Sequence, residues 1–208
     1  MSKWRERFID DNARKPSGWF GKKLYSYPLG HYRTFRLVLR ELRPRPDDVY
    51  LEIAQGGGVL LSRVLRTVER AAAIDHSADM VEEAIKNNRE VVDAGRAEIV
   101  QGDAESMPWP DGSFTCAACT EAFFFFENPV AVLGEIHRVL KPGGRLVVAT
   151  TPRSENRLAK AILTPYRRDL RLYSDEEMES MLKDAGFDEA RARSVNDLRQ
   201  ICYAEKHS

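Results

Sequence analysis

"LEIAQGGGVLLSRV", residues 51–64, places three consecutive glycines between a strand-like run and a helix-like run. The residues before the glycines (48–53) favour a strand, and those after them (59–68) favour a helix. Because glycine has no Cβ, such a turn lets a ligand approach the backbone closely. Open α/β sheets bind ligands beyond the carboxyl ends of their strands. The stretch therefore predicts an α/β domain with a ligand site beside these glycines.

Strand-like and helix-like runs alternate along most of the chain. The expected strands are 48–53, 71–75, 97–103, 113–120, 145–151, 190–195 and 200–206, and the expected helices are 59–68, 78–88, 130–140 and 175–185. The βαβαβ order and the near-continuous apolar strands indicate a mostly parallel sheet with helices on both faces.

Polar residues and glycines mark the expected helix ends. Ser77 can cap the helix that follows it, and Asn128, with a proline after it, can cap the next. Ser174 and Glu177 form a capping-box pattern. The KPGG run at 141–144 is expected to end its helix before a strand begins.

Composition and charge limit the class of protein. A chain of 208 residues with 43% hydrophobic residues is expected to form a globular domain with a full core. The apolar run 114–126 is interrupted by Glu121 and is too short to cross a bilayer. The N-terminus lacks an apolar signal region, and three cysteines do not suggest a disulfide framework. We therefore expect a cytoplasmic protein.

Positive charge is concentrated at the start of the chain. Residues 1–45 contain 12 Lys/Arg and 4 Asp/Glu, whereas residues 46–208 contain 20 and 28. We expect residues 1–45 to form a basic helical extension or lid, and residues 46–208 to form the α/β domain.

Two familiar ligand classes do not fit the glycine turn. A P-loop requires Lys-Ser or Lys-Thr after the glycines, and the chain has neither pair there. A dinucleotide turn requires G-x-G-x-x-G, but counting from Gly56 places Leu61 at the third glycine.

A third class does fit. "LEIAQGGG" resembles motif I of the class I S-adenosylmethionine-dependent methyltransferases, with Glu52 at the acidic position and Gly56 and Gly58 as the last two glycines. Asp75, "DHSADMVEEA", "QGDAESMPWPDGSF", "RVLKPGGRLVV" and "AGFDEA" resemble later stretches of the family in the same order. The resemblance covers about residues 45–206 and is closest to the ubiquinone/menaquinone-biosynthesis-like branch.

The resemblance implies a Rossmann-like, doubly wound, mostly parallel seven-stranded sheet and S-adenosyl-L-methionine as cofactor. It implies that Asp75 binds the ribose hydroxyls, that His76 and Met80 lie near the adenine, and that Asp103 and Ala104 bind the adenine edge. The implied cofactor positions are Glu52, Ala54, Gln55, Gly56, Gly58, Asp75, His76, Met80, Asp103, Ala104 and Thr120. Ala54 departs from the family pattern by replacing the first glycine, which we expect to be tolerated only if its φ is negative.

Other conspicuous residues have simpler interpretations. Cys116 and Cys119 form C-x-x-C inside a strand, where residues three apart point to opposite faces, so we expect two buried cysteines and no metal site. His137 is expected to be structural. The FFFF run at 123–126 either lines an apolar substrate cavity or packs in the core.

Acceptor recognition is expected from residues 14–33 and 152–173, which combine aromatic and basic residues. They suggest a small-molecule acceptor with an apolar body and an anionic group, although a solvated basic surface explains them equally well. His31, Tyr27 and Glu121 are the candidates for a general base, if the reaction needs one.

Two functional alternatives stay open. One is a protein that binds the cofactor without methyl transfer; the other is an interaction module whose basic segment contacts an anionic membrane. A nucleic-acid acceptor is not expected, because "TEAFF" stands where amino-methylating enzymes of nucleic acids have Asp/Asn-Pro-Pro-aromatic. The sequence assigns no oligomeric state.

Overall fold

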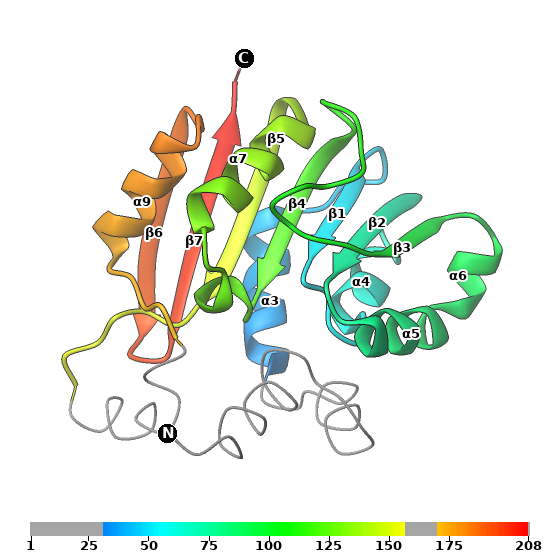
Figure 1. The fold of residues 1–208 in the computed structure, drawn as a ribbon, viewed down its shortest axis with the longest axis horizontal. Coiled ribbons are helices and arrows are strands. Elements are labelled where there is room, and N and C mark those ends of the chain that lie inside the picture. The colour runs from blue at the N-terminus through cyan, green and yellow to red at the C-terminus, as the bar shows by residue number, and fades with distance from the viewer. Residues whose placement is uncertain (1–30, 157–169, 208) are drawn as a thin grey trace.

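The computed structural model describes residues 31–156 and 170–207. Within them, seven strands form one sheet in the order β3-β2-β1-β4-β5-β7-β6 (Figure 1). The strands are β1 (Val49–Ile53), β2 (Arg70–Asp75), β3 (Ala97–Gln101), β4 (Phe114–Thr120), β5 (Leu140–Thr150), β6 (Glu189–Asn196) and β7 (Arg199–Lys206). The helices are α3 (Tyr32–Leu42), α4 (Val59–Val64), α5 (Ala78–Asn87), α6 (Arg89–Asp93), η3 (Phe123–Phe125), α7 (Pro129–Val139) and α9 (Asp175–Asp184). The predicted Rossmann-like fold class is confirmed.

The direction of the strands determines where a site can form. Strands β1 to β5 are parallel, and β7 runs antiparallel to both β5 and β6. The strand order reverses between β1 and β4, where the chain leaves one half of the sheet for the other. In such sheets the carboxyl ends at the reversal point leave room for a ligand.

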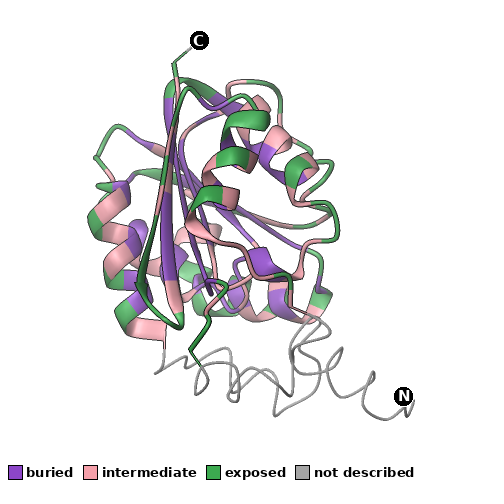
Figure 2. Ribbon diagram, turned by 90° about the vertical axis from the view of Figure 1, so that its left-hand side faces the viewer, coloured by how far each residue is buried: buried purple, intermediate pink, exposed green. Residues whose placement is uncertain are grey.

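Helices cover both faces of the sheet and create two cores. On one face, α7 and α9 bury Leu133, Ile136 and Leu182 against the sheet; on the other, α3 and α4 bury Val38 and Leu61. Figure 2 shows the buried strands between these two helical layers. Side chains along a strand point alternately to the two faces of the sheet, so each strand contributes to both cores. In β4, Cys119 packs in the first core and Cys116 in the second.

Helix α3 is held to the sheet by a buried ion pair. The Arg145 guanidinium donates to both carboxylate oxygens of Asp48 and to the backbone oxygens of Leu42 and Arg43, at the end of α3. Burial alone would raise the pKa of Asp48, but hydrogen bonds from Arg145, Thr115 and the Arg45 amide hold it below its ordinary value. The helix therefore shares a core with the sheet, and the division of the chain at residue 45 stays a prediction.

Side chains of α9 protect the edge strand β6. The backbone amides of Ala192 and Ser194 donate to the carboxylates of Glu179 and Asp175, at 2.9 Å each. Unpaired edge amides would otherwise offer a template for another strand.

Several predicted boundaries and caps needed correction. Strand β5 begins at Leu140, so the KPGG run ends α7 but belongs to the long strand. Helix α4 ends at Val64, earlier than expected, and β3 ends at Gln101. Ser77 occupies the N-cap of α5 without a capping bond from its side chain, and its backbone amide donates to Asp75 Oδ1.

The other two predicted caps are confirmed. Asn128 caps α7 through its side chain, and Ser174 with Glu177 forms both bonds of a capping box. Among residues 31–156 and 170–207, no helix is both long and apolar enough to cross a membrane.

Candidate active site

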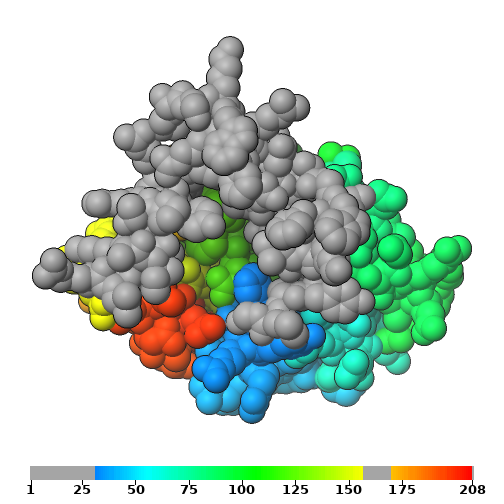
Figure 3. All heavy atoms as spheres, turned by 90° about the horizontal axis from the view of Figure 1, so that it is seen from below, coloured from blue at the N-terminus to red at the C-terminus, as the bar shows by residue number. Residues whose placement is uncertain are grey.

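A cavity of about 550 Å³ lies at the carboxyl ends of β1, β2 and β4. Figure 3 looks onto this edge of the molecule, where α3 (blue) lies between the C-terminal hairpin (red) and the residues after β1 (cyan). Every predicted cofactor position except Gly58 lines the cavity, and so do two of the candidate bases, His31 and Glu121. Tyr27, the third candidate, lies outside the described residues.

Asp75, the last residue of β2, is fixed by the glycine turn. Its Oδ2 accepts a hydrogen bond of 3.0 Å from the Gly56 amide, and its Oδ1 accepts one of 2.9 Å from the Ser77 amide. Burial raises the pKa of Asp75, while these two bonds and the neighbouring His76 limit the rise. Each oxygen keeps a lone pair that can accept a further hydrogen bond from a ligand hydroxyl.

Glu52 is a second buried carboxyl beside Asp75. The Tyr50 hydroxyl donates to its Oε2 at 3.3 Å, and no cation pairs with it among the described residues. Burial raises the pKa of Glu52 to about 8; the bond from Tyr50 opposes this rise and the Asp75 carboxylate adds to it. Two acidic groups held close together, with only the His76 imidazole near Asp75 as a basic partner, favour a positively charged ligand.

Two polar side chains of the cavity have no partner among the described residues. Both amide atoms of Gln55 are buried and unbonded, and so is the Thr120 hydroxyl. Leaving such groups unpaired costs free energy, so they indicate a ligand that supplies donors and acceptors. Together with the acidic pair, they fit a polar ligand that carries positive charge, such as a nucleoside-bearing sulfonium amino acid.

The expectation for Ala54 was wrong. Its φ is +54°, in the left-handed region, and its amide donates to the Ile74 oxygen at 2.8 Å. This bond continues the pairing of β1 with β2 while the chain turns away, so the backbone must adopt a conformation that glycine takes more easily. Alanine is strained there by about 1–2 kcal/mol.

Gly58 allows α4 to pack closely against α5 and does not line the cavity. Its φ is +71°, and a Cβ at this position would lie 2.6 Å from Asn88 Nδ2 and 3.1 Å from the Ala84 Cβ. The glycine therefore lets the start of α4 approach α5. Gly57 lines the cavity in its place.

The far end of the predicted cofactor region contains apolar and polar groups together. Met80 and Ile74 are buried, whereas His76 and Asp103 are exposed. Asp103 Oδ1 accepts from the Glu105 amide at 2.9 Å, so the loop after β3 holds this carboxylate in place.

Aromatic residues form the opposite wall. Phe35 of α3 and Phe125 and Phe126 of the FFFF run line the cavity, while Phe123 and Phe124 are buried. Core packing is therefore confirmed for Phe123 and Phe124, and a role of Phe125 and Phe126 in substrate binding stays a prediction. Phe35 was missed, although it precedes Val38 and Leu42 on one apolar face of α3 and this periodicity could have revealed it.

Of the predicted acceptor segments, residues 14–30 and 157–169 lie outside the described residues. The described lining of the cavity contains six carboxylates and no Lys or Arg. These carboxylates belong to Glu52, Asp75, Asp103, Glu105, Glu121 and Glu127.

The remaining reactive side chains lie elsewhere. Cys116 and Cys119 are buried and free, as expected. His137 packs on Phe187, with ring centroids 5.1 Å apart, and does not line the cavity. In the described ranges, Glu189, Glu205 and His207 are close enough to share a metal ion, but this exposed group lies at the opposite end of the sheet.

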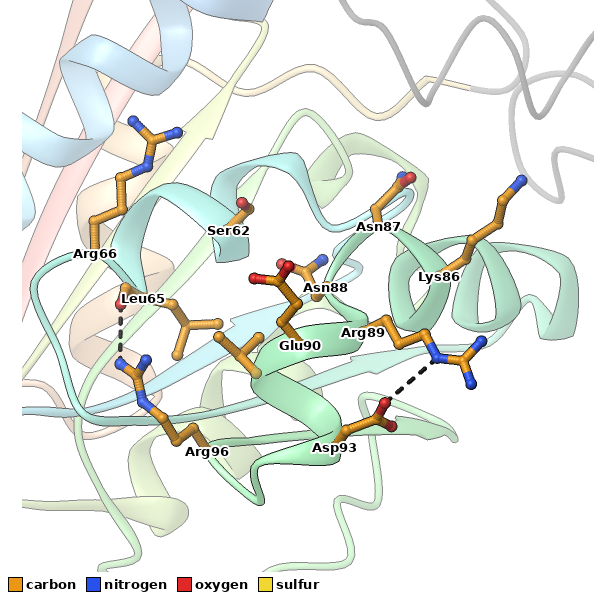
Figure 4. A pocket seen from close by; sticks show the side chains of 11 residues that line it. Ser62, Leu65, Arg66, Lys86, Asn87, Asn88, Arg89, Glu90, Asp93 and Arg96 are labelled. Atoms are coloured by element: carbon orange, nitrogen blue, oxygen red, sulfur yellow. Dashed lines mark hydrogen bonds and ion pairs between the residues drawn. The ribbon is translucent and has the colours of Figure 1, made fainter.

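A larger hollow of about 1080 Å³ lies between α4 and the α5–α6 pair (Figure 4). Several basic residues surround it, but the Arg96 guanidinium donates to the backbone oxygens of Leu65 and Val68, and Arg89 pairs with Asp93. Arg96 thus ties the end of α4 to the start of β3, and the Arg89–Asp93 pair lies within α6.

Comparisons with known proteins agree with this geometry. Residues 51–148 match the family model described as "Methyltransferase domain". A "Ubiquinone/menaquinone biosynthesis C-methyltransferase UbiE" from Teredinibacter turnerae is 26% identical over 216 residues, which cover 87% of this chain and 86% of that protein. An "Uncharacterized 37.1 kDa protein in transposon TN4556" from Streptomyces fradiae is 33% identical over 120 residues, or 56% of this chain and 34% of that protein. The match thus spans about a third of the Streptomyces protein's length.

A solved structure shares the fold. The phosphoethanolamine N-methyltransferase 2 of Haemonchus contortus, in complex with S-adenosyl-L-methionine, superposes with a TM-score of 0.78 at 16% identity, covering 100% of this chain and 61% of that one. The matched family model, the related sequences and the strand order agree with the residues that line the cavity. The family model over residues 51–148 and the related sequences support a class I S-adenosylmethionine-dependent methyltransferase.

Proposed function

We propose that this methyltransferase acts on a small-molecule acceptor with an apolar or aromatic body. One observation carries the proposal: a single cavity joins an acidic, polar end at the glycine turn to an aromatic wall formed by Phe35, Phe125 and Phe126. Such a cavity holds two ligands of different character, one polar and cationic and the other apolar.

The polar end holds S-adenosylmethionine in this proposal. Asp75 accepts hydrogen bonds from the ribose hydroxyls, since both its oxygens are fixed by backbone amides and still have lone pairs. Glu52 and Gln55 receive the charged methionine end, and Met80 and Ile74 enclose the adenine. The cofactor supplies an activated methyl group, so the protein contributes mainly alignment and exclusion of water.

The aromatic wall is where we place the acceptor. Phe125 and Phe126 follow β4 directly, and Phe35 reaches the same cavity from α3. An enzyme named for ubiquinone and menaquinone biosynthesis is among the relatives, which favours an acceptor with an aromatic ring. We further propose that the acceptor carries an anionic group, which basic residues of the segments 14–33 and 152–173 bind.

The first experiment measures thermal unfolding with S-adenosylmethionine, with S-adenosylhomocysteine and with NAD. At about 100 times its Kd a ligand adds roughly 2.7 kcal/mol to the free energy of unfolding. For a chain of this size we expect a rise in Tm of about 5–10 °C with the first two ligands and none with NAD. No rise with any ligand would contradict the proposed cofactor site.

The second experiment screens acceptors by the release of S-adenosylhomocysteine. Quinols and phenols with apolar substituents are compared with analogues that carry a carboxylate and with amines. Turnover confined to small polar acceptors would contradict the role of the aromatic wall.

A further inference from the structure

Glu121 has a backbone conformation that its neighbours impose. It follows the last residue of β4, its φ is +56°, and its amide donates to the Ala149 oxygen at 2.8 Å. A residue other than glycine in this region is strained by about 1–3 kcal/mol, and such strain is concentrated at functional sites. The bond to β5 turns the chain sharply here, and the Glu121 side chain lines the cavity as a result.

One oxygen of Glu121 is held and the other is free among the described residues. Thr34 Oγ1, on α3, donates to Glu121 Oε1 at 3.0 Å, and Arg199 Nε, on β7, donates to the same Thr34 oxygen at 3.1 Å. Thr34 is buried, so this chain of two bonds is shielded from solvent. No described donor bonds to Oε2, which leaves that oxygen available to a ligand.

The other carboxylates of the cavity differ from Glu121. Both oxygens of Asp75 accept from backbone amides, Glu52 accepts from Tyr50, and Asp103 accepts from the Glu105 amide while exposed to solvent. Glu121 alone among them combines partial burial and a fixed oxygen with a place directly before the aromatic segment 123–126.

We propose that Glu121 is the catalytic base: its free carboxylate oxygen accepts the proton that the acceptor atom loses during methyl transfer. This role rests on the proposed function and sharpens it, because it requires an acceptor whose nucleophilic atom carries a proton, such as a hydroxyl, an amine or an activated C–H group.

The step balances without a further reactant. The acceptor atom forms a bond to the methyl carbon as the carbon–sulfur bond breaks, and the electron pair of the broken bond stays on sulfur as a neutral thioether. The proton of the acceptor atom passes to Glu121, which returns it to solvent afterwards.

The surroundings of Glu121 suit a base. Burial raises its pKa, while His31, the hydrogen bond from Thr34 and Arg199 limit the rise. These are the titratable or charged groups that face it from α3 and β7. A carboxylate with a raised pKa accepts protons more readily.

The test needs no known acceptor. Sinefungin is an S-adenosylmethionine analogue in which a carbon bearing an ammonium group replaces the sulfur and its methyl group. Titration calorimetry compares its Kd with that of S-adenosylhomocysteine, for the full chain and for Glu121→Gln. The glutamine keeps an oxygen for Thr34 but has no charge, and Glu69→Gln, on an exposed turn, is the matched control.

We expect the preference for sinefungin over S-adenosylhomocysteine to fall about tenfold in Glu121→Gln and to stay unchanged in Glu69→Gln. In the unaltered protein the preference should weaken as the pH falls below the pKa of Glu121. An unchanged preference in Glu121→Gln, with both ligands bound, would overturn the proposal while leaving the proposed function intact. Failure of the unaltered protein to bind either ligand would overturn both.

A kinetic test follows once the screen supplies an acceptor. Glu121→Gln should lower kcat by about 100-fold or more, a larger factor than the rise of about tenfold expected in the KM for the cationic S-adenosylmethionine. The rise of kcat with pH should disappear in this variant and return in Glu121→Asp. A kcat and a pH profile like those of the unaltered protein would contradict a base role.

Discussion

Two groups of buried charge in this molecule are built in opposite ways. Around Arg145, both oxygens of Asp48 are paired with the guanidinium, and the remaining donors bind backbone oxygens at the end of α3. Around the cavity, Glu52 has no cation partner among the described residues, and Asp75 faces the neighbouring His76, whose Nδ1 lies 3.5 Å from its Oδ1. The first group is complete within the protein, whereas we propose that a ligand completes the second.

The pKa values express the same difference. Asp48 has a lowered pKa because its hydrogen bonds outweigh burial. Glu52 has a raised pKa because burial outweighs its hydrogen bonds with Tyr50 and the Leu61 backbone. Burial alone therefore does not distinguish these two carboxyl groups; the guanidinium that bonds both oxygens of Asp48 does.

Breaking the Asp48–Arg145 ion pair should have the largest effect on the free energy of unfolding. Arg145→Met leaves Asp48 buried and unpaired and frees the backbone oxygens at the end of α3, so we expect a loss of about 4 kcal/mol in the free energy of unfolding and a Tm lower by about 10 °C. Urea unfolding measures it, with the exposed Arg66→Met as control. A loss as small as that of the control would mean that the pair does not anchor α3.

The buried Glu52 carboxyl group should make the free energy of unfolding depend on pH. The Glu52 pKa is about 8 in the folded state and about 4.5 without burial, so the folded state binds more protons between these values and stability falls as the pH rises through that window. We expect the protein without ligand to lose on the order of 3 kcal/mol between pH 5 and pH 8. Glu52→Gln should remove most of this dependence; an unchanged slope of unfolding free energy against pH would contradict it.

Removing the charge of Asp75 should weaken the ligand more than the fold. Asp75→Asn loses charge-assisted acceptance from the ribose hydroxyls and from the Gly56 amide. We expect the Kd for S-adenosylhomocysteine to rise by about 10- to 100-fold in titration calorimetry. The exposed Asp93→Asn is a control; equal affinities for both variants would remove Asp75 from the proposed site.

Relieving the strain at Ala54 should have the smallest effect. Ala54→Gly removes the cost of a positive φ, and the greater freedom of glycine in the unfolded chain offsets part of the gain. We expect the free energy of unfolding to increase by about 0.5–1 kcal/mol, seen as a Tm higher by about 2–3 °C. A decrease would show that the surrounding strands do not impose the strained conformation.

Much of the cofactor region was predictable because its residues are local to strand ends. The glycine turn, Glu52 and Asp75 each follow or end a recognisable strand, and parallel strands bring their carboxyl ends together. The wall from α3 was not predicted, because Thr34 meets Glu121 across 87 residues and Arg199 across 165. No local sequence pattern predicts such long-range contacts.

The sequence by itself determined the alternation of strands and helices, the capping of α7 and α9, and the glycine turn that opens the cofactor end of the cavity. These features depend on periodicity and on side chains a few residues apart, and short-range forces suffice for them. Only the tertiary structure decided the positive φ of Ala54, the pairing of Asp48 with Arg145 and the isolation of Glu52. Each of these depends on which distant segment removes water from a group and whether that segment also brings a partner.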